Sequence, residues 1–118
     1  MHNLKELKIW HKAIELTVQV YKATENFPKE EKYGLTSQIR RAFVSISSNI
    51  SEGAGRNSDG EFIYFLGVAN GSSYELQTQL VIANKLSLLD EQIITPLLSE
   101  IDALQKMNYR LQETIRKE

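Results

Sequence analysis

The sequence contains no cysteine, which excludes disulfide bonds, thiol chemistry and cysteine-ligated metal sites. Its two histidines are His2 and His11, and neither follows a glutamate by three positions, as the di-iron helical bundles require. The serines around Ile46 and Ile50 have no histidine near them in the sequence, and Ser-x-x-Lys does not occur, so a serine nucleophile would lack an activating base. We therefore expect a protein that is not an enzyme and has no cofactor or metal.

Long apolar runs are also absent. No run approaches the roughly 18 residues that cross a membrane, and Met1–Glu6 lacks the layout of a secretory signal. The 118 residues fit one domain, residues 1–118, and the net charge of -1 with a pI of about 6.1 gives no overall attraction for polyanions. We expect a cytoplasmic protein without a membrane partner, with a mild basic bias in its first half.

Four stretches repeat apolar residues at steps of three and four, which is typical of amphipathic helices. No segment alternates with a period of two, so no strand is predicted. Short connections between long helices place neighbours antiparallel. The sequence predicts an all-α fold, an antiparallel up-down-up-down four-helix bundle, with helices at about residues 5–26, 36–53, 59–88 and 90–116.

The same spacing predicts which side chains form the core. In the first helix, the apolar residues at helical spacing are Leu7, Trp10, Ile14, Val18 and Tyr21. Of these, Trp10 and Tyr21 are expected in the core or at a subunit interface. In the second helix the predicted core face consists of Leu35, Ile39, Phe43, Ile46 and Ile50. In the third it consists of Phe62, Phe65 or Leu66, Ala69, Leu76, Leu80 and Ala83. Gly67 and Gly71 lie in the same helix at a cost of about 1 kcal/mol each relative to alanine, so we expect another helix to approach them, within the bundle or from another subunit.

Local signals mark the helix ends. Thr36 or Ser37 is a suitable cap for the second helix, because their hydroxyls accept hydrogen bonds from free backbone N–H groups. Gly53 is expected to end that helix in a left-handed conformation. Ser58 and Glu61 have the spacing of a capping box at the start of the third helix.

A second, polar stripe follows the second helix beside its apolar one. It consists of Gln38, Arg41, Ser45, Asn49 and Glu52. An ordinary surface helix carries solvated lysines and glutamates there, whereas these side chains are short or specific hydrogen-bonding groups. Two interpretations stay open: an internal network that fixes the register of the helices, and a surface that recognises a ligand.

An antiparallel hairpin of the second and third helices extends the structural interpretation. It places Arg41 beside Ser72 and Glu75, and Glu52 beside Glu61. We therefore predict an Arg41–Glu75 ion pair, with Arg56 near the carboxylates of the connecting loop. These carboxylates could in principle bind a metal, but ion pairing with the arginines is the simpler expectation.

The functional interpretation is a ligand- or RNA-contacting groove. It would use Arg41, Ser45, Asn49, Arg56 and Asn57, because arginine binds phosphate through two parallel hydrogen bonds and the free N–H groups after Ser58 favour an anion. Separately, the first helix places three lysines on one face, which could form a shallow nucleic-acid patch or an ordinary solvated face. These lysines are Lys5, Lys8 and Lys12.

Several blocks of the chain resemble one protein family. The blocks are Leu7–Ala13, Phe27-Pro28 with Tyr33–Leu35, Gln38–Ala42, Val44–Gly53 and Glu61–Leu76. They are similar to the four-helix-bundle proteins encoded in intervening sequences of bacterial 23S rRNA genes, which are sometimes labelled ribosomal proteins. The likeness covers about residues 4–115, and Ser47 stands where the family pattern usually has proline.

The resemblance implies a bacterial origin, a four-helix bundle and a homopentameric ring. It also implies kinship with accessory proteins of diversity-generating retroelements, which are basic barrels that bind nucleic acid and a reverse transcriptase. The low net charge departs from those basic relatives. We expect an interaction protein: either a homo-oligomeric scaffold associated with RNA or a nucleoprotein, or a protein-only adaptor that docks a partner on the oligomer surface.

Overall fold

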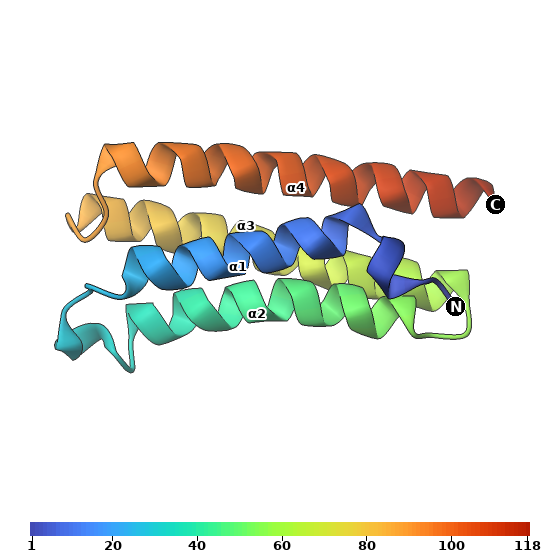
Figure 1. Ribbon diagram of the computed structural model, residues 1–118, viewed down its shortest axis with the longest axis horizontal. Coiled ribbons are helices and arrows are strands. Elements are labelled where there is room, and N and C mark those ends of the chain that lie inside the picture. The colour runs from blue at the N-terminus through green and yellow to red at the C-terminus, as the bar shows by residue number, and fades with distance from the viewer.

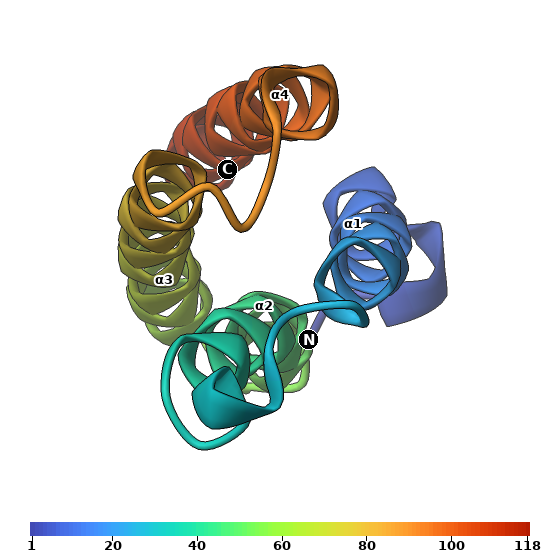
Figure 2. The ribbon, with the colours of Figure 1, turned by 90° about the vertical axis from the view of Figure 1, so that its left-hand side faces the viewer.

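The computed structural model describes residues 1–118 and contains four long helices and no strand. The helices are α1 (Lys8–Thr24), α2 (Leu35–Ala54), α3 (Asp59–Lys85) and α4 (Glu91–Lys117), with short 3-10 helices at Leu4–Glu6 and Lys29–Glu31. Consecutive helices run antiparallel along the long axis (Figure 1). Viewed end-on, they occupy four corners in chain order, so that α1 lies diagonally opposite α3 (Figure 2). The predicted up-down-up-down bundle is confirmed.

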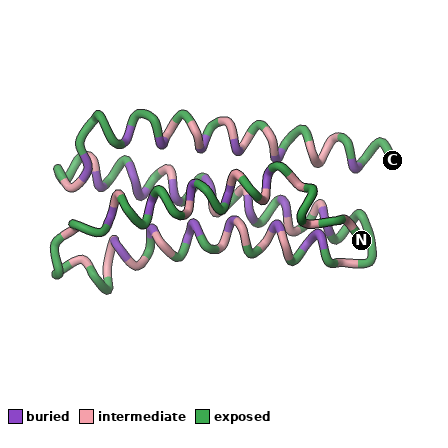
Figure 3. The backbone as a smooth tube through the Cα atoms, viewed as in Figure 1, coloured by how far each residue is buried: buried purple, intermediate pink, exposed green.

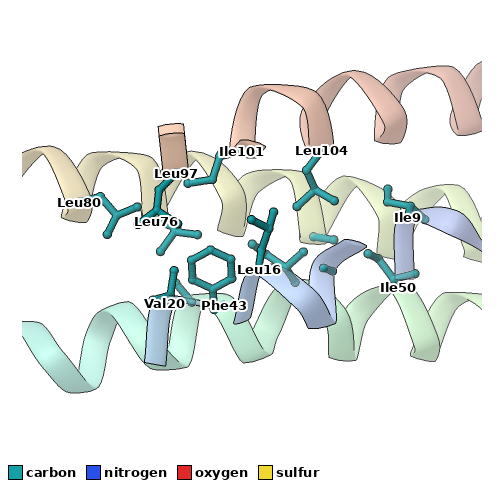
Figure 4. Close-up of a cluster of buried hydrophobic side chains, with 14 of the residues drawn as sticks. Ile9, Leu16, Val20, Phe43, Ile50, Leu76, Leu80, Leu97, Ile101 and Leu104 are labelled. Carbon is teal, nitrogen blue, oxygen red and sulfur yellow. The ribbon is translucent and has the colours of Figure 1, made fainter. Parts of the chain in front are cut away.

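The core runs the length of the bundle as one continuous set of 22 buried apolar residues. Buried positions recur along the inward side of each helix (Figure 3). In the middle of the core, Phe43 packs among leucines and isoleucines from the other helices (Figure 4). Of the core residues predicted for the second helix, Ile39, Phe43, Ile46 and Ile50 are buried, and Leu35 is partly buried. Those predicted for the third helix are also buried, and of the alternatives Phe65 and Leu66 the buried one is Leu66.

The apolar stripe predicted for the first helix is only partly buried: Leu7 and Trp10 pack against the core, whereas the rest of the stripe is exposed. The core face of α1 consists of Ile9, Ala13, Leu16 and Val20. Ile14 is 39% exposed and Val18 is 49% exposed. Both stripes have helical spacing, so periodicity does not distinguish them. The observed rotation of α1 brings Lys12 beside Glu100 of α4, where the two side chains form an ion pair.

The start of α2 also differs from the prediction. Its N-cap is Gly34, which lacks a side chain, so neither Thr36 nor Ser37 caps the helix. The carboxylate of Glu31 instead accepts a hydrogen bond from the Leu35 N–H at 3.3 Å. A carboxylate from the preceding turn therefore replaces the expected hydroxyl.

Gly53 lies inside α2 and no glycine in the chain has a positive φ, so its predicted left-handed conformation is wrong. The reason for glycine here is a close contact between helices. A Cβ at this position would lie 2.8 Å from the Phe65 Cβ and 2.9 Å from the Phe62 Cδ1. The helix hairpin closes at this point because Gly53 has no side chain.

The third helix begins with the predicted Ser58 cap, but the Glu61 carboxylate accepts the Ser58 hydroxyl rather than the Ser58 N–H of a full capping box. The Ser58 hydroxyl accepts a hydrogen bond from the Glu61 N–H at 3.2 Å and donates one to the Glu61 carboxylate at 3.0 Å. The helix ends at Lys85 rather than near residue 88. None of the helices is long and apolar enough to cross a membrane.

Candidate functional site

Part of the predicted polar stripe forms a seam between α2 and α3. The Oγ atoms of Ser45 and Ser72 lie 3.0 Å apart. Asn49 donates its side-chain N–H groups to the Ser45 carbonyl at 2.8 Å and to the Ser45 Oγ at 3.1 Å. All three side chains are half-buried. This arrangement favours the structural interpretation for Ser45, Asn49 and Ser72, because their hydrogen bonds are made within the hairpin.

Arg41 and Glu75 are neighbours without forming the predicted ion pair. Both line a groove between α2 and α3, together with Gln38 and Gln79. No carboxylate lies within 4.0 Å of the Arg41 guanidinium, and the Glu75 carboxylate accepts a hydrogen bond from Gln79 instead. Because Arg41 is exposed, water solvates its charge and burial does not force it to take a partner.

Arg56 lies near two carboxylates, as predicted. Its Nη2 lies 2.8 Å from the Glu52 Oε1 and its Nη1 lies 3.9 Å from the Glu61 Oε2. The guanidinium carbon also lies 4.9 Å from the centre of the Phe65 ring. The charge of Arg56 is therefore compensated at the end of the hairpin, while the neighbouring Asn57 is exposed.

The start of α3 is a poor place for an anion. Its first turn carries Asp59 and Glu61, which already provide negative charge near the free N–H groups. The imidazole of His2 lies 3.1 Å from the Asp59 carboxylate and 4.6 Å from the Phe62 ring. The predicted anion site beside Arg56 and Asn57 is thus occupied by the protein's own carboxylates.

The predicted lysine patch on the first helix is divided. Lys12 is half-buried and pairs with Glu100 of α4. Lys5 and Lys8 are exposed and form no ion pair within 4.0 Å. Lys8 shares a shallow apolar hollow with Arg110 of α4, about 310 Å³ in volume. Two lysines therefore remain free to meet an external anion.

A second polar seam, between α3 and α4, was not predicted. The Gln105 side-chain amide donates to the Ser73 hydroxyl at 3.1 Å. Asn108 is 3% exposed and donates to the Leu66 carbonyl at 2.9 Å. The signal was present in the sequence, because Asn108 replaces an apolar residue four positions after Leu104. Each of the two seams therefore joins neighbouring helices by side-chain hydrogen bonds.

The outward side of α3 is apolar and nearly uncharged. Tyr64 is 66% exposed, and Tyr74 is 56% exposed. A Cβ built at Gly67 or at Gly71 meets no atom within 4 Å. The other exposed apolar side chains of this helix are Val68, Val81 and Ile82. No other helix of the bundle approaches the two glycines, so the first of the two expected explanations for them, a close approach within the bundle, is wrong.

We call this surface the outer α3 face and define it by residues of α3 that point away from the core. They are Tyr64, Gly67, Val68, Gly71, Tyr74, Glu75, Thr78, Val81 and Ile82. The full helix has four charged residues among 27, namely Asp59, Glu61, Glu75 and Lys85. Only Glu75 lies in the central part of the helix.

A solved structure has the same fold. It is a protein of unknown function from the S23 ribosomal protein family of Bacteroides thetaiotaomicron VPI-5482. It superimposes with a TM-score of 0.79 at 20% sequence identity, over 88% of this chain and 97% of that one. At this identity the likeness shows the fold alone. No curated protein matches the sequence.

A protein-family model also matches the sequence. The model of the 23S rRNA-intervening sequence protein matches residues 5–110, nearly the whole chain. The matched range includes all of α1, α2 and α3, both glycines of the outer α3 face and the α2–α3 seam. The chain therefore belongs to the family of 23S rRNA-intervening sequence proteins.

Proposed function

We propose that the chain is a non-enzymatic, cytoplasmic scaffold that assembles into a homo-oligomeric ring of five copies and associates with RNA or a nucleoprotein. The observation that carries the self-association is the outer α3 face. It exposes tyrosines and aliphatic side chains around two glycines, with almost no charge. Contiguous exposed apolar surfaces of this kind mark interaction sites.

The two glycines support a helix as the partner. Each costs about 1 kcal/mol of helix propensity relative to alanine. Within one copy nothing offsets this cost, because no atom would touch a Cβ at Gly67 or at Gly71. A helix from a second copy could approach the backbone closely here, with Tyr64 and Tyr74 packing at its sides.

The exposed stripe of α1 supplies the complementary surface. Ile14 and Val18 are exposed on α1, which lies diagonally opposite α3 in the bundle (Figure 2). Contact between α1 of one copy and α3 of the next joins two different surfaces. Contacts of that type repeat around an axis and close into a ring when the rotation permits it.

The experiment that tests this assembly is the mass in solution of a Gly67→Leu/Gly71→Leu variant. Leucine fits the isolated bundle, because both positions are open, and it is a better helix former than glycine. We therefore expect the helix content to be retained while the oligomer dissociates into 13.5 kDa chains.

The matched control is Ser99→Leu, which adds similar apolar bulk at an exposed position of α4. It should leave the oligomer intact. If the double glycine variant keeps the same mass as the wild type, the outer α3 face is not the interface. Light scattering coupled to gel filtration gives the mass, and far-UV circular dichroism checks the fold.

A second candidate is a protein-only adaptor that docks a partner on the oligomer surface without nucleic acid. The acidic pI of about 6.1 favours it, as do the ion pairs that compensate Lys12 and Arg56. Salt dependence separates the two functions. Binding through phosphates weakens steeply as salt rises, whereas apolar docking does not.

A further inference from the structure

A basic groove lies at the end of the bundle where α1 connects to α2. It is an open hollow of about 610 Å³ between the last turn of α1, the connection and the first turns of α2. Three of its nine lining residues are cationic and none is acidic; the cations are Lys32, Arg40 and Arg41. The α2–α3 loop with Arg56 lies at the opposite end (Figure 1).

The three cations of the groove have no counter-ion. None of them lies within 4.0 Å of a carboxylate, whereas Lys12, Arg56, Lys106 and Arg116 all form ion pairs elsewhere on the molecule. In the connection, the Glu31 carboxylate accepts the Leu35 N–H. Glu25 lines the neighbouring hollow with Lys32 and Arg40 but forms no ion pair with either. In a chain with a net charge of -1, this is a local concentration of uncompensated positive charge.

Arg40 is held in place for an external ligand. Its Nε donates to the Thr24 hydroxyl at 3.1 Å and its Nη2 donates to the Tyr21 carbonyl at 3.2 Å. Its guanidinium carbon lies 4.4 Å from the centre of the Tyr21 ring. These contacts leave both N–H groups of Nη1 without a partner in the protein, so the side chain is oriented before it meets an anion.

The first turn of α2 adds donors to the same groove. The first intrahelical hydrogen bond is made by the Gln38 N–H, so the N–H groups of Thr36 and Ser37 have no partner in the helix backbone. Thr36 is only 8% exposed, and its hydroxyl has no hydrogen-bond partner. Thr36 lines the groove and the hollow next to it. The Glu31 carboxylate caps only the Leu35 N–H, and free N–H groups at a helix start favour a phosphate.

An exposed aromatic ring completes the groove. Tyr33 is 88% exposed, the most exposed of the large apolar and aromatic side chains. The ammonium group of Lys32 lies 5.4 Å from the centre of its ring. A flat ring beside cations is the combination that binds single strands, because a base stacks on the ring while the backbone phosphates meet the charges.

We propose that this groove binds single-stranded RNA, with backbone phosphates at Arg40, Arg41 and Lys32 and a base on Tyr33. The inference rests on the RNA association proposed above, which it assigns to a place on the molecule. It moves the RNA contact away from Lys5, Lys8 and Arg56. The groove lies on the α1–α2 side of the bundle, and of its lining residues only Arg41 also lines the hollow that contains Thr78 of the outer α3 face.

The test is fluorescence anisotropy of a labelled ten-nucleotide single-stranded RNA of mixed sequence, at low and moderate salt. The groove variant is Lys32→Glu/Arg41→Glu, at two exposed positions whose side chains form no hydrogen bond or ion pair in the protein. We expect it to weaken RNA binding by at least about tenfold, and to reduce the magnitude of the salt slope by about 1.4, the value for two phosphate contacts with a single strand.

The matched control is Lys5→Glu/Lys8→Glu, which makes the same change in net charge at the other basic surface. We expect it to weaken RNA binding by less than about threefold, through long-range charge alone. Tyr33→Ala, which leaves the charge unchanged, should weaken binding by at least about fivefold, and Tyr109→Ala on α4 should not.

The outcomes separate the two proposals. If the wild-type protein does not bind RNA at low salt, the proposed RNA association fails, and the groove assignment fails with it. If the wild-type protein binds RNA but the groove variant binds equally well, only the groove assignment is overturned. A larger loss in the Lys5→Glu/Lys8→Glu control would also overturn it. Circular dichroism of each variant verifies that the bundle remains folded.

Discussion

Gly53 is buried and Arg41 is exposed, and this difference decides whether the residue serves packing or outside contacts. Gly53 is buried against Phe62 and Phe65, where even a methyl group would collide with α3. Arg41 is exposed, forms no ion pair and leaves its neighbour Glu75 bonded to Gln79. The first residue is therefore required by packing, whereas the second is available for contacts outside the chain.

Gly53→Ala should destabilise the bundle. Alanine is the better helix former by about 1 kcal/mol, but its Cβ would lie within 2.9 Å of both phenylalanines. Overpacking of this kind costs about 1–3 kcal/mol. The Phe65 Cβ is fixed to the backbone of α3, so relieving the contact requires a shift of that helix. Denaturant unfolding should give a lower midpoint. Gly60→Ala, at an open position, is the control and should not lower it.

Arg41→Ala should leave the free energy of unfolding unchanged within about 0.5 kcal/mol, because an exposed arginine without a partner contributes little. The buried Arg41–Glu75 pair expected from the sequence would instead cost about 3–5 kcal/mol when one partner is removed. Urea denaturation distinguishes these values easily. A loss of more than about 2 kcal/mol would show that Arg41 has a structural partner.

The α3 helix differs from the other three in having no clearly polar side. Its inward residues fill the core, its flanks carry the two polar seams and its outward residues are mostly apolar. A helix that is apolar on opposite sides is typically covered on both of them. One copy of the chain covers only the inward side of α3, which is why the outer α3 face is the strongest indication of assembly.

The start of α3 depends on Ser58, so Ser58→Ala should lower stability by about 1 kcal/mol. The substitution removes the acceptor for the Glu61 N–H and the donor to the Glu61 carboxylate. Thermal unfolding followed by circular dichroism measures the effect. Ser99→Ala, at an exposed position within α4, is the control and should be neutral. Equal midpoints for the two variants would show that the cap contributes nothing.

At the scale of the whole molecule, the sequence predicts the core-facing residues of a helix when that helix carries a single apolar stripe. Residues such as Ile39 and Phe43 could be placed in the core because the neighbouring stripe of the second helix is polar. For α1 two stripes compete, and the choice depends on contacts with α4 such as Lys12–Glu100. The basic groove was missed because it forms only when the connection folds Lys32 back beside Arg40. The one available signal was the absence of any acidic residue within four positions of Arg40 and Arg41.

Self-association is the property on which the scaffold function depends, and the mass of the wild-type protein in solution tests it most directly. Light scattering across a range of protein concentrations gives this mass without reference to shape. We predict about 67 kDa, five times the chain mass of 13.5 kDa. A mass of 13.5 kDa at every concentration would contradict self-association. The outer α3 face would then be left without the second copy that we propose to cover it.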